Sequence, residues 1–338
     1  MIDDKREILA SIEKISSIAR GFMGSVVLTA AAELELFTLL AEGPLSPKEV
    51  ADRLSLDRRA TEIFLRALAG MELVVAGNGK FGNSEIAESF LVRGRPYYQG
   101  DIIRHNANIH RRWIELPEVL RTGRPAQGAR AAEDSRLRRD FILGMKNSAI
   151  LGAQRLAAEI DVASARRLLD VGGGPGTYAI EFCRHNPRLT ASVFDLPPVI
   201  GEITREQVNE AGLQDRIECI GGDYLKDSLG EGYDLVLVSN IIHSLGEAEI
   251  RRLFAGCRKA AAPGGRIVVK DFLLDEDRIA PAFASLFAVN MLTGTESGNC
   301  YTAGEVRRWL EEAGFSGLEY RRSSPRDRLL IGTASMNS

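Results

Sequence analysis

Several short apolar segments in the second half of this 338-residue chain end in polar residues whose types could do chemistry. In the first, residues 168–177, an apolar strand runs into Asp170 and then into a glycine cluster. Such a turn between strand and helix lets the backbone approach a ligand, and the helix N-terminus offers free N–H groups to it. We therefore expect a nucleoside pocket, although a merely tight turn would also use glycines.

The acid before the glycines indicates which ligand the pocket takes. Gly172, Gly174 and Thr177 match the G-x-G-x-x-G/A spacing of dinucleotide sites, with a small residue in third place. Asp170 would repel a pyrophosphate, but it suits a ligand that carries an ammonium group. The pocket therefore favours S-adenosylmethionine over NAD.

The next two predicted strands carry acids at their ends. The strand 190–194 leads to Asp195, 21 residues after Gly174, which is the spacing of a ribose-binding acid. The strand 217–220 leads to Asp223, which could accept from an adenine amino group, and to Tyr224, which could pack on the base.

Two further predicted strands, 234–238 and 266–270, lead to His243 and Asp271. Ligands of open parallel sheets bind outside the carboxyl ends of the strands. A single Asp after a strand is usually a helix cap or turn former. Five polar strand ends in succession favour a binding site.

These residues resemble the class I S-adenosylmethionine-dependent O-methyltransferases of the caffeate and hydroxyindole type, a family that includes bacterial polyketide and pigment enzymes of secondary metabolism. The resemblance covers nearly the whole chain and is most specific at 170–176, 194–198, 221–223 and 240–243. It implies that the glycines line the cofactor and that His243 is the general base. The expected cofactor-binding residues are Asp170, Gly172, Gly173, Gly174, Gly176, Asp195, Leu196, Asp223, Tyr224, Ser239 and Asn240.

The reaction explains why a base is wanted. A phenol has a pKa near 10, so about one molecule in a thousand is phenolate at neutral pH, a deficit of roughly 4 kcal/mol. A neutral histidine can take that proton. We expect His243 and Asp271 to be the catalytic pair, with Asp271 holding the tautomer and steadying the imidazolium. The alternatives are a structural histidine and a structural acid after a strand.

Two departures from the family pattern widen the expected chemistry. Plant members have Trp and Asp shortly after the catalytic His, where this chain has residues 244–246, and the family's second glutamate falls on Cys300. Some members of the family have drifted to N-methylation, C-methylation or hydroxylation. Methyl transfer to nitrogen or carbon of a heteroaromatic, for which His243 would be dispensable, is therefore the alternative reaction.

The first hundred residues predict a mostly helical winged-helix module. Ile8, Ile12, Ile15 and Phe22 form one apolar helical stripe. The other predicted elements are helices at 28–40, 46–54 and 58–73 and a strand pair at 74–81 that turns at 77–79.

A winged helix raises the hypothesis of a cofactor-sensing, DNA-binding regulator. The helix that would enter the groove mixes acids with arginines, and the chain has a net charge of −3 and a pI near 6.0. DNA affinity depends on phosphate contacts, so we expect no nucleic-acid partner. The resemblance instead implies a homodimer in which this module closes over the partner's substrate pocket.

The expected fold is α/β: a doubly wound Rossmann-like methyltransferase domain, 161–338, behind a winged-helix dimerisation domain, 1–100, and a helical linker, 101–160. An apolar segment at 283–292 is expected to wall the acceptor site, and a hairpin at 318–322 and 329–332 to finish the fold. The acceptor would be a hydroxylated aromatic or polycyclic small molecule. The expected pocket residues, which could equally be core packing, are His110, Trp113, Phe141, Met145, Asn290 and Met291.

The remaining expectations concern surroundings. The four cysteines lack C-x-x-C spacing and the histidines lack metal-site spacing, so we expect no metal and a reducing compartment. We find no signal peptide and no apolar run of about 20 residues, and so expect a cytoplasmic protein without a membrane span. Residues 121–128 read as a surface loop and 136–139 as a solvated helix face.

Overall fold

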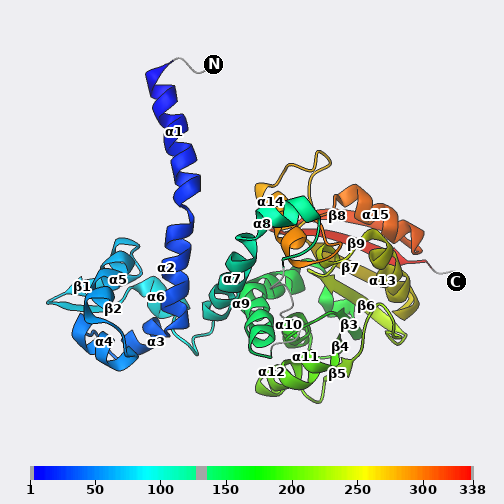
Figure 1. The fold of residues 1–338 in the computed structure, drawn as a ribbon. Helices are drawn as coiled ribbons and strands as arrows, with labels where there is room; N and C mark the ends of the chain where they lie inside the picture. Colours follow the sequence, from blue (N-terminus) through cyan, green and yellow to red (C-terminus); the bar gives the residue numbers. More distant parts are fainter. Residues whose placement is uncertain (1–3, 127–134, 336–338) are drawn as a thin grey trace. The chain divides into compact units, whose positions relative to one another are not determined.

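The computed structural model describes residues 4–126 and 135–335 of the chain (Figure 1). The chain divides into two compact units, Met1–Asn108 and Ile109–Ser338. The three-part division expected from the sequence, with boundaries after residues 100 and 160, stays a prediction.

The first unit is a helical module with a small wing. Its core gathers apolar side chains from the helices and the hairpin, Phe37, Leu65 and Phe81 among them. Its elements are α1 (Lys5–Arg20), α2 (Phe22–Glu33), α3 (Leu36–Leu40), α4 (Pro47–Leu54), α5 (Arg58–Gly70), β1 (Val74–Gly77), β2 (Lys80–Asn83) and α6 (Glu85–Phe90).

Two predictions from local sequence are confirmed in this unit, one for a helix cap and one for the turn of the hairpin. Ser46 caps α4 in a capping box with Glu49, with a proline in the first turn. The hairpin turns through Asn78 and Gly79, both with positive φ, as a two-residue turn that matches strand twist requires.

Two helix boundaries in this unit were predicted wrongly. The expected helix 28–40 is interrupted at Glu35, which has φ 53° and separates α2 from α3. The helix expected to reach residue 73 ends at Gly70, because Glu72 takes the left-handed conformation before β1 begins. In both cases apolar periodicity continues past the residue at which the backbone turns.

The second unit is a doubly wound sheet of seven strands in the order β5-β4-β3-β6-β7-β9-β8. The first five run parallel, while β9 and β8 form the antiparallel hairpin that the sequence predicts. The strand order reverses between β3 and β6, where ligands of such sheets bind. The strands are β3 (Arg167–Val171), β4 (Thr190–Asp195), β5 (Ile217–Gly221), β6 (Tyr233–Ser239), β7 (Ala261–Asp271), β8 (Phe315–Arg322) and β9 (Arg328–Ala334).

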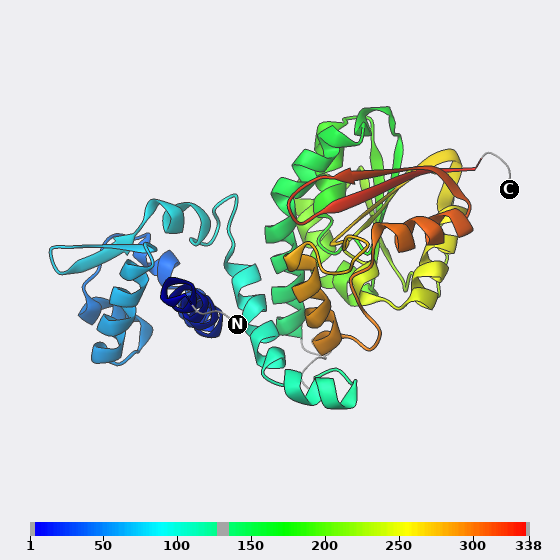
Figure 2. The same ribbon diagram turned by 90° about the horizontal axis from the view of Figure 1, so that it is seen from above.

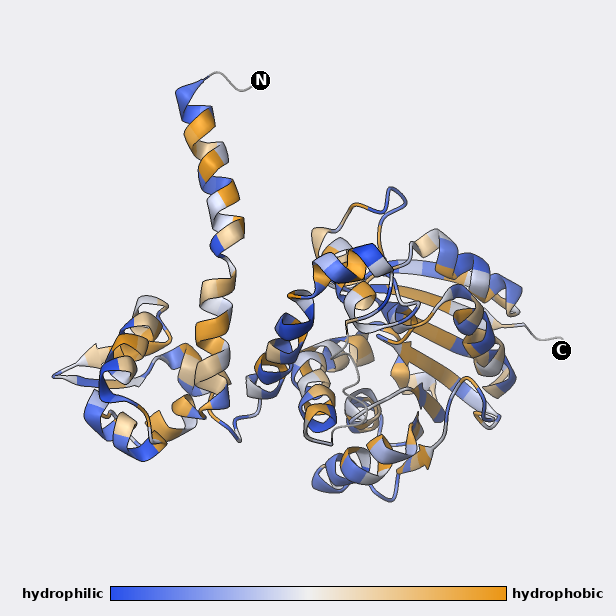
Figure 3. Ribbon diagram, in the orientation of Figure 1, coloured by the Kyte–Doolittle hydropathy of each residue, from blue (hydrophilic) through white to orange (hydrophobic). Residues whose placement is uncertain are grey.

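Helices cover both faces of this sheet (Figures 1 and 2). Successive strand residues point to opposite faces, so Leu168 joins the core beneath α9 and α10 whereas Leu169 joins the core beneath α13 and α15. Figure 3 shows the apolar residues concentrated on the strands. The helices of eight or more residues in or entering this unit are α7 (Gly100–Trp113), α9 (Ser135–Glu159), α10 (Thr177–His185), α13 (Glu247–Ala260), α14 (Ala282–Gly294) and α15 (Ala303–Glu312).

Two expectations about the surface need correction. The expected loop 121–128 begins only at Gly123, because α8 (Leu116–Thr122) includes its first two residues, and 127–128 lie outside the described residues. The basic face on α9 is not simply solvated: Arg138 and Arg139 make ion pairs with Glu202 and Glu206.

One stretch, Lys5–Glu33, is long and apolar enough by length and composition to cross a membrane, contrary to our expectation from the sequence. It consists of α1 and α2, and only 11% of its most apolar window is buried within the chain. Its apolar side chains are therefore available to a partner.

Candidate active site

The glycine loop between β3 and α10 lies at the switch point of the sheet. Gly172 has φ +64°, and a Cβ there would stand 2.3 Å from Cδ1 of Ile241. A Cβ on Gly173 would stand 2.8 Å from Cγ of Asp170. No larger side chain fits at either position without displacing a neighbour, so glycine is needed for the loop to pack this closely on Ile241 and Asp170.

Asp170 lies beneath this loop at the end of β3 and is 1% exposed. Burial raises the pKa of its carboxyl to about 7, the charge of Asp195 adds to this, and a hydrogen bond from the backbone N–H of Ala179 opposes it. Its Oδ2 is buried and has no hydrogen-bond partner. A buried acceptor without a donor is suited to a cationic ligand group.

Asp195 lies against the same loop. The backbone N–H of Gly174 donates to its Oδ2 at 2.7 Å, and the N–H of Leu196 donates to its Oδ1 at 2.7 Å. Burial raises the pKa of this carboxyl as well. The fold thus joins the predicted ribose acid to the predicted cofactor loop, and each carboxylate oxygen keeps a further lone pair for a ligand hydroxyl.

The residues predicted to frame the adenine follow β5. Asp223 accepts from the N–H of Leu225 at 2.9 Å and pairs with Lys226 at 2.7 Å, so part of its capacity is used within its own turn. Tyr224 is directed at the glycine loop, with its ring 3.7 Å from a Cβ built on Gly172, and burial raises its pKa to about 12.

The ends of β6 and β7 bring His243 and Asp271 together. Nδ1 of His243 lies 2.7 Å from Oδ1 of Asp271, which also accepts from the N–H of Phe272. The side chain of His243 is 13% exposed and that of Asp271 is 2% exposed. If Nδ1 carries the ring proton and donates a hydrogen bond to Asp271, Nε2 is left with a free lone pair.

Aromatic rings and a thiol surround this pair. Phe272 stacks on the His243 ring, and Phe287 from α14 meets it edge-on, with centroids 4.9 Å apart. Burial raises the pKa of Cys300 to about 12, and Asp271 contributes to this shift. The thiol is therefore protonated at neutral pH and does not replace a second carboxylate.

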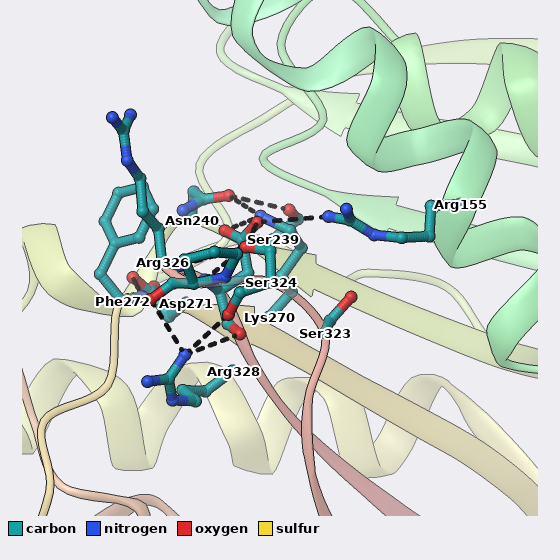
Figure 4. A network of polar contacts seen from close by, with 12 residues as sticks. Arg155, Ser239, Asn240, Lys270, Asp271, Phe272, Ser323, Ser324, Arg326 and Arg328 are labelled. Atoms are coloured by element: carbon teal, nitrogen blue, oxygen red, sulfur yellow. Dashed lines mark hydrogen bonds and ion pairs between the residues drawn. The ribbon is translucent and has the colours of Figure 1, made fainter. Parts of the chain in front are cut away.

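Lys270, which the sequence analysis did not single out, anchors a buried polar network beside the site (Figure 4). Its Nζ donates to Oδ1 of Asn240 at 2.9 Å and to Oδ1 of Asp327 at 2.6 Å. Burial opposes its charge, but Tyr178 and Asp327 outweigh burial and raise its pKa. The sequence signal that could have identified Lys270 is the presence of a lysine within the apolar run of β7.

Asn240 is held on several sides by this network. Its backbone has φ 57° and its N–H donates to the carbonyl of Lys270, while Ser239 Oγ donates to its Oδ1 at 3.2 Å. Its Nδ2 is buried and has no partner. The carboxamide is thus fixed with an unused donor at the end of β6.

The orphaned polar atoms of the described residues gather at this edge of the sheet. Four of the seven lie at the ends of β3, β6 and β7 or at the start of α10; they belong to Asp170, Thr177, Asn240 and Asp271. Native structures rarely leave such atoms unpaired without a ligand or a water.

The predicted acceptor-site residues are only partly brought together. Nε1 of Trp113 donates to Oδ1 of Asn290 at 3.1 Å, and Met291 beside it is 8% exposed. Met145 is half-buried on α9, whereas His110 and Phe141 are exposed on α7 and α9.

A hollow of about 780 Å³ lies at the opposite edge of the sheet, lined by the starts of β3 and β7 and by the turn before β6, and it carries none of these groups. A smaller hollow of about 200 Å³ lies beside α10 and includes Thr177 in its lining. Within 4–126 and 135–335, no group of three or more His, Cys, Asp or Glu side chains could hold a metal ion.

Comparison with known proteins identifies two family domains. The O-methyltransferase domain matches residues 113–316, and the O-methyltransferase dimerisation domain matches residues 16–93.

Named relatives match along most of their length. The chain is 35% identical to 3-hydroxy-5-methyl-1-naphthoate 3-O-methyltransferase of Streptomyces sahachiroi, over 89% of each chain. It is 33% identical to the tetracenomycin polyketide synthesis 8-O-methyl transferase of Streptomyces glaucescens, over 94% of this chain and 95% of the relative. It is 30% identical to the N,N-dimethyltransferase OxyT of Streptomyces rimosus, over 91% of each.

A solved structure agrees with the fold. Human N-acetylserotonin methyltransferase, in complex with S-adenosylmethionine, superposes with a TM-score of 0.86 and 27% identity over 98% of this chain and 99% of the human chain.

Proposed function

The chain belongs to the S-adenosylmethionine-dependent O-methyltransferase family, and we propose that it methylates a hydroxyl group of an aromatic or polycyclic small molecule, with His243 as the general base. The observation that carries the proposal is the His243 Nδ1 to Asp271 Oδ1 contact of 2.7 Å, at the same edge of the sheet as a closely packed glycine loop. The names of two bacterial relatives, acting on a hydroxynaphthoate and in tetracenomycin polyketide synthesis, support this acceptor class.

The loop residues fit S-adenosylmethionine. The orphaned Oδ2 of Asp170 suits the ammonium of the methionine part, and the carboxylate of Asp195, fixed by Gly174, suits the ribose hydroxyls. Tyr224 offers a half-buried ring for the adenine. When bound, the sulfonium supplies an electrophilic methyl group.

His243 and Asp271 then act on the acceptor. Asp271 accepts a hydrogen bond from the Nδ1–H group and stays ionised, which leaves Nε2 to take the hydroxyl proton of the acceptor as the oxygen becomes nucleophilic. The buried carboxylate steadies the imidazolium that forms. Phe272 and Phe287 keep water from the imidazole and confine the acceptor oxygen, so that orientation supplies much of the remaining rate.

Asn240 and Lys270 complete this edge of the site. Because Lys270 holds Oδ1 of Asn240, the free Nδ2 is available to donate to a polar group of the bound cofactor. We assign Lys270 a positioning role through Asn240.

The first unit serves a homodimer. The exposed apolar residues of α1 and α2 are Ile8, Leu9, Ile12, Ile15, Ile18, Phe22, Met23 and Val26. An apolar surface of this length is covered by another protein surface in a stable state, and the matched dimerisation domain begins at residue 16. A second copy of this chain is the proposed cover.

Methyl transfer to nitrogen is the second candidate. It is favoured by the likeness to an N,N-dimethyltransferase and by Cys300, a protonated thiol near Asp271 that cannot help an imidazolium carry charge as a second carboxylate would. An amine acceptor needs no comparable base because its neutral form is already nucleophilic.

The test is release of S-adenosylhomocysteine from labelled cofactor with a panel of hydroxynaphthoates, hydroxyindoles and aromatic amines. We expect turnover with the hydroxylated members. Turnover confined to amines would replace the proposal by the second candidate.

A further inference from the structure

Arg112, at the end of α7, has a guanidinium without a counter-charge in the part of the chain described. Its Nε is buried and has no hydrogen-bond partner, and within 4–126 and 135–335 the guanidinium makes no ion pair with a carboxylate. Burial lowers the pKa of the guanidinium. Buried charges in proteins are normally paired, so an arginine in this state is suited to an anion that arrives from outside.

The guanidinium is positioned against α14. A Cβ on Gly294 would stand 2.6 Å from Nη1 of Arg112, so the glycine leaves the space that the guanidinium occupies. Gly294 shares one helical stripe with Phe287, Asn290 and Met291, because these residues are spaced by three, four and seven. The same stripe contacts His243 through Phe287 and Trp113 through Asn290.

The end of α14 does not use Arg112 as a cap. Three carbonyls near its end accept from other groups: Met291 from the N–H of Thr295, Asn290 from the hydroxyl of Thr293, and Thr293 from the N–H of Ala126. The negative end of the α14 dipole favours a cation at this position, but this interaction does not use the N–H donors of the Arg112 guanidinium.

We propose that Arg112 is an anion-binding residue of the acceptor site and that the acceptor carries a carboxylate. A planar guanidinium matches a carboxylate with two parallel hydrogen bonds, which a neutral acceptor cannot provide. The inference rests on the proposed function, since it places the anion on the acceptor of the same site.

The position of Arg112 also sets the size of the acceptor. Gly294 lies two helical turns beyond Phe287, which is about 10 Å along the axis from the ring that contacts His243. The reacting hydroxyl and the carboxylate must therefore lie well apart. An acidic hydroxyarene with at least two fused rings spans this distance better than a single ring.

The test compares 6-hydroxy-2-naphthoate with its methyl ester, by calorimetric binding to the enzyme loaded with S-adenosylhomocysteine and by turnover. The wild type should bind the acid more tightly than the ester. Arg112→Met should weaken acid binding about 10- to 100-fold and leave ester binding unchanged, as expected for loss of a charged hydrogen-bonded pair. Gly294→Ala, which displaces the guanidinium without removing its charge, should act in the same direction but less strongly.

Arg121→Met is the matched control, because it removes the same charge from an exposed site on α8 and should change neither ligand. Equal binding of acid and ester by the wild type, binding of neither, or equal losses for both in Arg112→Met would overturn the anion site. Turnover of acid and ester without a preference for the acid would contradict this inference but not the proposed function. Acid-selective binding without turnover of any hydroxyarene would contradict the proposed function but not the anion site.

Discussion

The two units of this protein leave different kinds of groups unsatisfied. In the second unit, orphaned polar atoms collect at the carboxyl ends of β3, β6 and β7, while exposed apolar side chains are scattered. In the first unit, one buried polar atom among the described residues lacks a partner, on Asn83, but α1 and α2 expose a continuous apolar stripe. The kind of group left over indicates the kind of partner: a small polar ligand in one unit and a protein surface in the other.

The largest effect is expected at the base. His243→Ala should lower kcat for a hydroxylated acceptor by about 10²- to 10⁴-fold, because the proton acceptor is lost, with little change in cofactor affinity. Steady-state kinetics and calorimetry measure the two quantities. His185→Ala, at an exposed position ending α10, is the control and should be silent. A His243→Ala enzyme that keeps the wild-type rate would show that His243 does not take the proton of the acceptor.

Asp170 should couple cofactor binding to pH and stability. Asp170→Asn should weaken S-adenosylmethionine binding about 100-fold, because the ammonium loses a charged partner. In the wild type, affinity should fall as pH drops below about 7, where the carboxyl becomes protonated. Calorimetry across pH 6 to 8 measures this.

The sign for stability is opposite. The folded pKa of Asp170, about 7, lies above its ordinary 3.8. The free energy of unfolding of the ligand-free protein therefore falls as pH rises from 3.8 to about 7. Ligand-free Asp170→Asn should therefore be more stable than the wild type at pH 8, by on the order of 1 to 3 kcal/mol. Asp215→Asn, at an exposed carboxylate, should change neither property. A destabilised Asp170→Asn with normal cofactor affinity would make Asp170 structural.

Charged substitutions in the apolar stripe of α1 and α2 should change the oligomeric state of the protein. Ile12→Glu with Ile15→Glu should convert a dimer to a monomer at micromolar concentration, because two carboxylates would be buried in the interface. Light scattering after size exclusion reads the mass. Val75→Glu, exposed on the hairpin, is the matched control. A wild-type monomer, or a double variant that stays dimeric, would contradict the assignment of this surface.

The smallest effect is expected from the positioning lysine. Lys270→Met frees the carboxamide of Asn240, and kcat/KM should fall about 10-fold, mainly through KM for S-adenosylmethionine. Lys270→Arg should recover part of the loss, and Arg155→Met, 3.9 Å from the same Asp327, should have little effect. A lower melting temperature without any change in KM would reduce Lys270 to a structural role.

Much of the second unit could be predicted from sequence, because its elements are set by local signals. The five parallel strands are confirmed with the polar residues at their ends, since apolar runs stop where glycine or acid begins. The approach of His243 to Asp271 follows from topology, because neighbouring parallel strands bring their carboxyl ends to one edge.

The remainder depends on tertiary contacts that no local pattern contains. Lys270 is a partnered cation only because the turn before β9 brings Asp327 to it. The sequence predicts Arg138 and Arg139 to be solvated, but the helical segment 200–210 packs beside them and supplies Glu202 and Glu206 as ion-pair partners. Glu35 breaks an apolar run that looks continuous, because the chain must turn to build the core of the first unit.

The most direct test of the central claim is chemical rescue of His243→Ala by added imidazole during methyl transfer to a hydroxylated acceptor. If His243 takes the acceptor proton, imidazole should restore a measurable share of the rate in that variant, rising with the neutral fraction of imidazole, and should not rescue Asp170→Asn. An unimpaired His243→Ala enzyme, or an impaired one that imidazole cannot rescue at any pH, would contradict the assignment of His243 as the base.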